Sequence, residues 1–483
     1  MSERAEPTLA DRARATRVVV VGGGIAGLTA AWECARIGMP VVLLEAGTRV
    51  GGAIETATLD GIDIDLAAEV FSLSAPALAD LIDQLELRAD VEPAADESVA
   101  VAVAAGDGLH VVPLPANRAG IPANVWAPAV RRLVGSAGVW RAYLDRLRPP
   151  LTIGRERRLG ALVRTRMGAR IRDRLVAPLT IGTWGVDPDE IDVDLAVPGL
   201  SAALTRAGSL GGAVDQLLPA RSEDGAEPPR ARRATLRGGM GRLVQALAER
   251  LLTLDADIRV GHAVTALSRT ETGWLVHVDG GDDAVDRGDD GVPQPLPADI
   301  VVLAAGAPAA STLLAPLGVT LDAPARPARE VVTLVMDAGT SAAGPATVYP
   351  VPGAMAAASV IDAGAAWPSV RAASGPARRV FRVTVDPDQG GDDPLALAAR
   401  DLTRLWPGIG AIRASAQRTA FLAPPSSTLG HAERAAALRA RIAPLGRIVA
   451  VGEDLAGGGI SSVVADTIDE VERVRHDVLW GRP

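Results

Sequence analysis

The stretch RVVVVGGGIAGLTAAWECARIGMPVVLLEAGTRVGGAIET, residues 17–56, decides the fold. It opens with a run of valines, as expected of a parallel strand buried on both faces. Gly22, Gly24 and Gly27 follow in the spacing G-x-G-x-x-G. In a nucleotide-binding turn the first glycine allows the tight turn and the second lets a pyrophosphate approach the backbone. The third lets the helix pack closely on the strand.

The residues after this turn predict a helix from about Ile25 to Ile37 and a second strand that ends at Glu45. Such a helix points its unpaired N–H groups and its positive dipole end at a phosphate. The Glu45 carboxylate follows Gly27 at the spacing expected of an acceptor for the ribose hydroxyls of adenosine. A glycine turn without a ligand would leave Glu45 unexplained. We therefore predict a dinucleotide site that includes Gly22, Gly23, Gly24, Ile25, Ala26, Gly27, Glu45 and Ala46.

Composition narrows the class of protein. A chain of 483 residues needs more than one domain. Its net charge of -9 argues against nucleic acid as a partner. Cys34 is the single cysteine, which excludes intrachain disulfides and cysteine metal sites, and the five histidines are scattered, so we predict no metal. The sequence contains no lysine, so all 49 basic residues are arginine.

Neither end of the chain nor its interior predicts a membrane span. Residues 1–16 carry charges throughout and read as a disordered tail, without the apolar segment of a signal peptide. Residues 300–321 are uncharged and about long enough to cross a bilayer, but Gly306, Pro308, Pro316 and Gly318 divide them. A buried strand, turn and helix is the better interpretation, and we expect a cytoplasmic protein.

The segment AGTRVGG, residues 46–52, together with the first motif, resembles the signature of the flavin amine oxidase superfamily. The resemblance implies FAD as the cofactor. It places Arg49 at the pyrophosphate and lets the chain run beside the flavin at Gly51 and Gly52. Ala53 and Thr56 would line the same channel.

Two later segments resemble further flavin-domain pieces of this superfamily. GRIVAVGEDLAGGGISSVVADTIDEVERV, residues 446–474, predicts a strand, a glycine run and a helix that starts near Ser461. By resemblance it places Gly452, Gly458, Gly459 and Ile460 at the isoalloxazine. TLRGGMGRLVQALAERL, residues 235–251, predicts a glycine turn and an amphipathic helix. The strand predicted in DIRVGHAVTAL, residues 257–267, would put Val264 at the adenine end.

Within the superfamily, the absence of lysine disfavours a standard amine oxidase, whose lysine holds a water against the flavin. Cys34 lies on the wrong helix for a covalent link, so FAD should be non-covalent. HVVPLPANRAGIP (residues 110–122), RLVAPLTIGTWGVDPDEIDVDLAVPGL (174–200), residues 235–251 and Gly430-His431 resemble the protoporphyrinogen and coproporphyrinogen III oxidases of haem biosynthesis. The sequence departs from their pattern at Ala53, where a basic residue is usual. It also has Ala67, Ala68, Glu69 and Val70 in place of Gly-Pro-Asp-Ser, at positions expected beside the cofactor.

The resemblance implies oxidation of a porphyrinogen by hydride transfer to FAD, with molecular oxygen as the acceptor. Coproporphyrinogen has four propionates against two in protoporphyrinogen, so a more cationic pocket is expected for it. Arg118, Arg131 and Arg132 are candidates for this role, or they are solvated surface arginines. His431 either faces the flavin or packs beneath the last helix. We assign no catalytic acid or base, because aromatisation of the macrocycle supplies much of the driving force.

Alternatives remain open at this point. They are another carbon-oxidising flavoenzyme, desaturase-like or amine oxidase-like, and a degenerate flavoprotein without activity. A weak peripheral membrane contact through the helical region and the number of subunits are also left open by the sequence.

The predicted fold class is mixed α/β: a Rossmann-like FAD-binding domain, a β-rich substrate domain and a helical subdomain. We expect residues 17–95, 228–324 and 427–483 in the discontinuous FAD-binding domain. Residues 96–124 and 325–426 would form the substrate-binding domain, and residues 125–227 the helical subdomain. The polar tracts at 221–233 and 280–297 are expected to be exposed linkers or loops.

Overall fold

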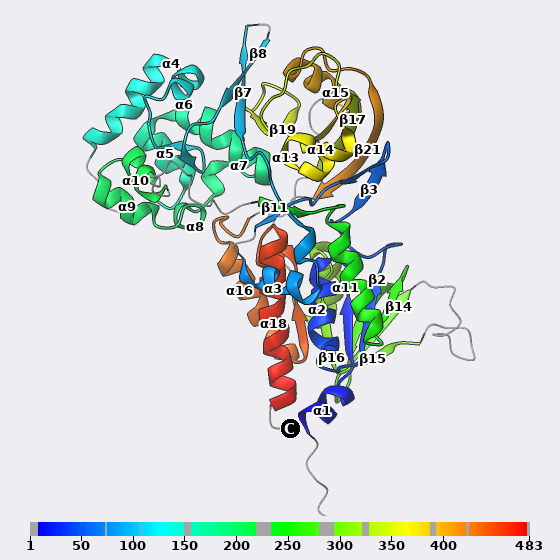
Figure 1. Ribbon diagram of the computed structural model, residues 1–483. Helices are drawn as coiled ribbons and strands as arrows, with labels where there is room; N and C mark the ends of the chain where they lie inside the picture. Colours follow the sequence, from blue (N-terminus) through cyan, green and yellow to red (C-terminus); the bar gives the residue numbers. More distant parts are fainter. Residues whose placement is uncertain are drawn as a thin grey trace, which may run out of the picture.

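The computed structural model describes residues 8–72, 75–106, 108–148, 156–218, 233–279, 294–320, 328–386, 393–421 and 425–480. A parallel sheet occupies the lower half of Figure 1, and its five strands come from distant parts of the chain. In spatial order they are β12 (Asp257–Val260), β2 (Val41–Glu45), β1 (Val18–Val21), β16 (Ile300–Leu303) and β22 (Ile448–Ala450). Each neighbouring pair is parallel. The carboxyl ends of β1, β16 and β22 therefore meet at one edge.

Helices cover one face of this sheet with a large apolar core. The covering helices are α2 (Ile25–Ala35), α3 (Pro76–Gln84), α11 (Gly241–Thr253) and α18 (Ile460–Trp480). The amphipathic pattern predicted for α11 is confirmed, since Leu243, Leu247 and Leu251 are all buried. Cys34 on α2 is buried as well.

The other face is covered by a small antiparallel sheet and two helices. These elements are β13 (Ala263–Arg269), β14 (Trp274–Asp279), β15 (Leu296–Ala298), α12 (Ala307–Leu314) and α16 (His431–Ile442). The stretch DIRVGHAVTAL, predicted to supply one strand, supplies β12 and β13, which belong to two different sheets. Of the predicted linkers, residues 221–232 and 280–293 lie outside the described residues. Arg233 begins β11 and Leu296 begins β15.

The predicted tail at residues 1–16 is wrong for residues 9–15, which form α1 (Leu9–Ala15). The Thr8 side chain and Asp11 make a reciprocal capping box, which satisfies two N–H groups at the start of this helix. Arg12 donates from Nη1 to the carbonyl of Leu479 at 3.0 Å, so α1 docks on the last turn of α18. Ala13 is the single buried residue of α1, and one small apolar position gives no visible hydrophobic period. Residues 1–7 lie outside the described part of the chain.

A seven-stranded sheet lies at the upper right of Figure 1. Its order is β21 (Ile412–Phe421), β17 (Ala328–Asp337), β20 (Arg378–Val385), β19 (Ala357–Asp362), β18 (Thr347–Pro350), β7 (Val99–Ala105) and β8 (Gly108–Pro113). All neighbouring pairs are antiparallel except β18 with β7. One face packs against α15 (Pro394–Leu405). The other packs on the hairpin β3 (Thr56–Leu59) and β4 (Ile62–Asp65), and on α13 (Ala363–Ala366) and α14 (Pro368–Ser374).

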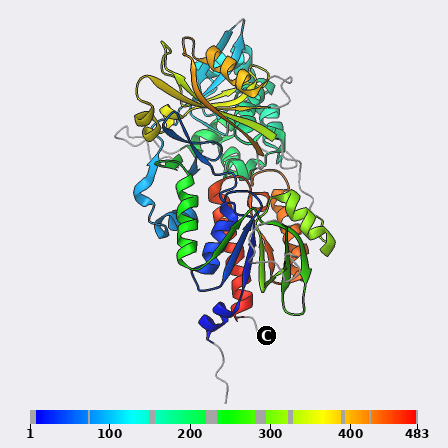
Figure 2. The same cartoon turned by 90° about the vertical axis from the view of Figure 1, so that its right-hand side faces the viewer.

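The described residues in 128–148 and 156–217 form a helical layer beside this sheet (Figures 1 and 2). It contains α4 (Pro128–Tyr143), α5 (Leu159–Met167), α6 (Ala169–Ile171), a π-helical turn η3 (Arg172–Val176), α7 (Ala177–Trp184), α8 (Val193–Ala196), α9 (Leu200–Ala207) and α10 (Leu210–Leu217). Inside its core, Asp145 accepts a hydrogen bond of 2.5 Å from Nε of Arg166, and both side chains are buried.

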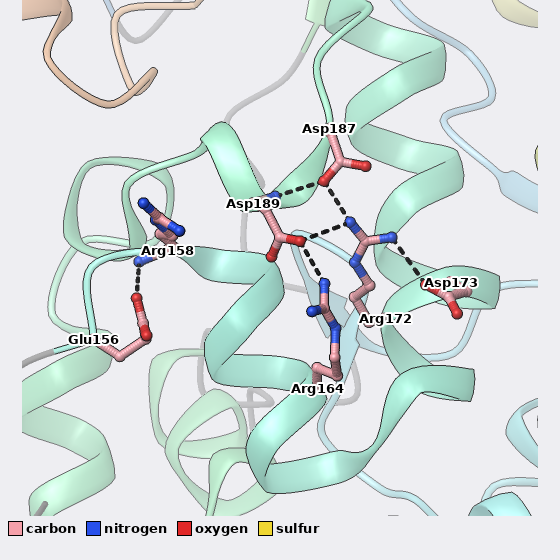
Figure 3. Close-up of polar contacts among 7 residues, drawn as sticks. All are labelled: Glu156, Arg158, Arg164, Arg172, Asp173, Asp187 and Asp189. Carbon is pink, nitrogen blue, oxygen red and sulfur yellow. Dashed lines mark hydrogen bonds and ion pairs between the residues drawn. The ribbon is translucent and has the colours of Figure 1, made fainter.

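Arginine–aspartate contacts join α5 and η3 to the segment of residues 187–189 (Figure 3). Arg172 contacts Asp187 and lies 3.0 Å from Asp189, and Arg164 also contacts Asp189. Asp187 begins the short helix η4 (Pro188–Glu190) and accepts a hydrogen bond from the Asp189 N–H at 2.8 Å. Asp187, which lies in the motif of residues 174–200, is thus part of a structural network.

The remaining elements connect these layers. They are β5 (Phe71–Ser72), β6 (Val91–Pro93) and β11 (Arg233–Leu236) in one small sheet, the hairpin β9 (Asn117–Arg118) and β10 (Ile121–Pro122), α17 (Glu453–Ala456), and the short helices η1 (Arg88–Asp90), η2 (Leu144–Leu147), η6 (Ala315–Leu317) and η7 (Ala443–Leu445). The mixed α/β class is confirmed. Among the described residues, the helices are too short or too polar to cross a membrane.

Candidate cofactor site

Of the three motif glycines in the turn between β1 and α2, one borders open space and two are closely packed. At Gly22, with a φ of +104°, a Cβ atom would lie 2.7 Å from the carbonyl oxygen of Ala304. At Gly27 it would collide with the carbonyl of Gly22. At Gly24 it would meet nothing within 4 Å. The first and third glycines are therefore required by packing, whereas the second borders open space, as the approach of a pyrophosphate requires.

The helix that follows this turn presents its start to the same space. α2 begins at Ile25 with Gly24 as its N-cap, and no side chain caps its first turn. The N–H groups of a first turn have no partner within the helix, and they favour an anion. Ile25 and Ala26 thus occupy the positions expected of phosphate-facing residues.

Glu45 is held at the carboxyl end of β2 by two backbone donors. Its Oε2 accepts a hydrogen bond from the Gly23 N–H and its Oε1 from the Gly47 N–H, both at 2.7 Å. A carboxylate has about four acceptor positions, so two remain for ribose hydroxyls. The His262 N–H donates to the Glu45 carbonyl at 2.9 Å, which brings the β12–β13 turn beside it. Val264, predicted at the adenine end, is half-buried two residues further along β13.

The second glycine pair lies directly against the first. The Gly51 N–H donates to the Gly23 carbonyl at 2.7 Å, and Gly51 forms an isolated parallel bridge with Gly24. A Cβ on Gly52 would lie 3.1 Å from the Cα of Gly24. The guanidinium of Arg49 donates to the carbonyls of Gly52 and Ile54, each at 3.1 Å. In this structure Arg49 thus braces the loop, and its contact with a pyrophosphate stays a prediction.

The segments around Ala53 and Ala67 run side by side. The Ala68 N–H donates to the Ala53 carbonyl at 3.4 Å, and the Thr56 hydroxyl donates to Asp65 at 2.5 Å. Glu69, in the segment that departs from the related oxidases, pairs with Arg382 of β20 at 2.7 Å, and both side chains are largely buried. Val70 packs against the core beneath the seven-stranded sheet.

Asp65 is a buried acid that the sequence analysis did not single out. Burial raises its pKa to about 6, although hydrogen bonds from the Thr56 hydroxyl and the Met240 N–H lower it. No signal in the sequence marks it, because alternation in β4 would put Asp65 on the exposed face with Asp63, whereas Asp65 is buried like Ile62 and Ile64. An acid buried at the end of such a strand is unusual unless it has partners.

The C-terminal glycine run reaches the same edge of the parallel sheet. The Val451 N–H donates to the carbonyl of Leu303, which continues the β16–β22 pairing to the carboxyl end. Gly452 and Gly459 have φ values of +126° and +113°, and a Cβ on either would meet nothing within 4 Å. α18 begins at Ile460, next to Gly458 and Gly459, and packs on α2. The two ends of the chain therefore meet where the cofactor was expected.

A family model described as flavin containing amine oxidoreductase matches residues 25–342, which is more than half of the chain. The chain belongs to this family. FAD is its cofactor, and the protein is an FAD-dependent oxidoreductase. The glycine turn, the open position at Gly24 and the anchored Glu45 fit that cofactor.

The chain is similar to curated coproporphyrinogen III oxidases and to a solved structure. It is 27% identical over 515 residues to the coproporphyrinogen III oxidase of Propionibacterium freudenreichii subsp. freudenreichii, covering 96% of this chain and 92% of that protein. It is 34% identical over 206 residues to the coproporphyrinogen III oxidase of Mycobacterium leprae, covering 41% of this chain and 44% of that protein. A crystal structure from Exiguobacterium sp. 255-15, provisionally named a protoporphyrinogen oxidase, has a TM-score of 0.79 at 23% identity. The alignment covers 96% of this chain and 99% of that one. At this identity the similarity establishes the fold and nothing beyond it.

The arginines predicted for the substrate lie apart from the cofactor loops of this flavin amine oxidoreductase. Arg118 is exposed and donates to the Leu217 carbonyl at 3.0 Å. Arg131 and Arg132 are exposed on α4, at the outer side of the helical layer in Figure 1. The structure brings none of the three into contact with the glycine turns. It gives them the surroundings of solvated surface residues, and a role toward substrate stays a prediction.

His431 is buried at the start of α16. It lines a largely apolar cavity of about 140 Å³ together with Leu438, Asp454 and Leu455. Burial, and next the neighbouring Arg434, lower its pKa, so the imidazole is neutral over a wider range of pH. This cavity lies on the face of the sheet that carries α12 and α16, whereas α18 covers the opposite face.

Proposed function

We propose that this protein oxidises a porphyrinogen to the corresponding porphyrin, with coproporphyrinogen III as the first substrate to test. The similarity to a coproporphyrinogen III oxidase over 96% of this chain carries the proposal. The complete absence of lysine supports it against a standard amine oxidase. Protoporphyrinogen IX is the alternative substrate, since a plant relative at 27% identity is named a mitochondrial protoporphyrinogen oxidase.

Bound FAD would supply the oxidising power by accepting a hydride from a carbon donor. The chain's own part is binding and orientation. Glu45 would bind the adenosine ribose, and Gly24 with the start of α2 would bind the pyrophosphate. The loop from Gly51 to Thr56, the segment 67–70 and the glycines before α18 would line the flavin. The start of α18 carries the positive end of a helix dipole, which favours negative charge nearby.

The substrate must be held with a bridge carbon roughly 3–3.5 Å from the flavin, because hydride transfer requires a near-attack geometry. We propose that the seven-stranded sheet and the helical layer form the substrate cavity, and that residues 17–95, 228–324 and 427–483 carry the cofactor. Oxygen would be the final acceptor. In balance, the porphyrinogen loses six hydrogen atoms, and three molecules of oxygen become three of hydrogen peroxide.

A parallel assay of coproporphyrinogen III and protoporphyrinogen IX tests this proposal. Porphyrin fluorescence and oxygen consumption are followed for the purified FAD-loaded protein, with a blank for spontaneous oxidation. The expected result is porphyrin formation above the blank, with three oxygen molecules used for each porphyrin. Flavin that neither porphyrinogen reduces under anaerobic conditions would overturn the proposal. Reduction by an amine would then favour an amine oxidase-like activity, and reduction by no donor would favour the degenerate flavoprotein.

A further inference from the structure

An arginine from the seven-stranded sheet binds the loop that carries the second glycine pair. Arg418 of β21 donates from Nη2 to the carbonyl oxygen of Gly52 at 2.7 Å. Its Nη1 contacts the carboxylate of Glu55 in the same loop. The two partners lie more than 360 residues apart in the sequence. The contact therefore joins two layers of the fold at the cofactor loop.

Gly52 is a position where such a contact matters. Its φ of +58° lies in the left-handed region, and a glycine there can change its peptide orientation easily. The Gly52 carbonyl accepts from both Arg49 at 3.1 Å and Arg418 at 2.7 Å. A carbonyl has two lone pairs, so these two donors complete its hydrogen bonding. The peptide after Gly52 is thereby fixed beside Gly24.

The loop also has an excess of positive charge. Arg49 and Arg418 share a single carboxylate, Glu55, which leaves one positive charge in the cluster. The side chain of Arg418 is only 24% exposed, so water screens its charge incompletely. The Ala53 side chain, next to Gly52, is exposed and brings no charge of its own. Gly52, whose carbonyl both arginines bind, lies against Gly24, beside which an anionic group is expected.

We propose that Arg418 is a positioning residue for FAD. It brings a cation from β21 to the loop, and it holds the Gly52 peptide in place without the cofactor. Loops that are ordered before binding lose less entropy when the ligand binds, so this contact should raise the affinity for FAD. The inference depends on FAD as the cofactor and not on which substrate is oxidised, so a failed porphyrinogen assay would leave it standing.

The test compares Arg418→Ala with Arg413→Ala. Arg413 lies on the same strand but pairs at the exposed surface with Asp337, so its variant controls for the loss of an arginine from β21. The apoprotein of each is titrated with FAD by flavin fluorescence, and the melting temperature of each apoprotein is recorded. We expect Arg418→Ala to raise the Kd for FAD at least tenfold, with a weaker dependence of Kd on salt concentration. Arg413→Ala should leave Kd unchanged.

A second pair of variants tests whether Arg418 positions the loop for FAD or only attaches the seven-stranded sheet to the loop. Arg418→Lys keeps the charge but cannot bind Gly52 and Glu55 with a planar fork, and an intermediate Kd is expected. Ala53→Arg in the Arg418→Ala background should recover part of the affinity. An unchanged Kd in Arg418→Ala with a lower melting temperature would overturn the inference, because attachment alone predicts that result. If Arg418→Ala does not fold, Arg418→Lys takes its place, and a Kd for FAD equal to that of the wild type would overturn the inference.

Discussion

The glycine turn of the cofactor site and the arginine–aspartate network of the helical layer stabilise their parts of the chain by opposite means. At Gly22 and Gly27 a side chain would collide with backbone atoms, and at Gly24 the missing side chain leaves open space. In the helical layer long charged side chains join separate helices, as Arg172 does with Asp187 and Asp189 (Figure 3). A change at the turn should therefore affect the ligand first, whereas a change in the network should affect stability first.

The largest effect is expected at Gly24. Gly24→Val should abolish FAD binding, because the side chain would fill the open space that the pyrophosphate needs. The apoprotein should still fold, since a Cβ at Gly24 meets no atom of the described residues within 4 Å. The ratio of flavin to protein absorbance after purification measures the effect. A yellow variant with full flavin content would contradict the cofactor assignment.

Arg166→Ala tests the helical layer at its buried ion pair with Asp145, which is separate from the network in Figure 3. Its loss leaves Asp145 buried without its ion-pair partner, and breaking a buried pair in this way costs about 3–5 kcal/mol. Denaturant unfolding followed by circular dichroism should show this loss. The Kd for FAD of the folded fraction should not change. A clear weakening of FAD binding would mean that the helical layer and the cofactor site are coupled.

Asp65 provides a pH-dependent test within the cofactor region. Folded Asp65 keeps its proton up to about pH 6, whereas an ordinary aspartate has a pKa of 3.8. Between these values the folded state binds more protons than the unfolded state, so this group lowers stability as the pH rises. Asp65→Asn does not ionise, so it should gain about 2 kcal/mol on the wild-type apoprotein from pH 4 to pH 7. If the free energy of unfolding differs between Asp65→Asn and the wild type by the same amount at every pH, the raised pKa is wrong.

The smallest effect is expected from Glu45→Gln. Glutamine keeps the size and one acceptor oxygen but loses the negative charge that the Gly23 and Gly47 N–H groups bind. We expect the Kd for FAD to rise roughly tenfold, since hydrogen bonds to charged groups are worth about 1.5–3 kcal/mol. Isothermal titration with FAD measures the change. An equal change with riboflavin, which has no adenosine, would show that Glu45 does not act through the ribose.

The parallel sheet and its glycine turn could be predicted because their signals are local. β1, the turn, α2, β2 and Glu45 lie within one short stretch, and each has a backbone reason for its residue type. The helix of residues 9–15 was missed because its single buried residue gives no hydrophobic period and its contact with α18 joins distant parts of the chain. Arg382 and Arg418 were missed because their partners, Glu69 and Gly52, lie more than 300 residues away. No local period marks an arginine that acts across such a separation.

The docking of α1 on the end of α18 has a practical consequence for work on this protein. Arg12 of α1 donates to Leu479 of α18, and the two helices meet at the bottom of Figure 1, away from the seven-stranded sheet. An affinity tag, a fluorophore or a surface linker attached at α1 or at the end of α18 would therefore lie far from the substrate cavity we propose. The same proximity suits a circular permutant, in which a connector joins the two helices and new termini open elsewhere.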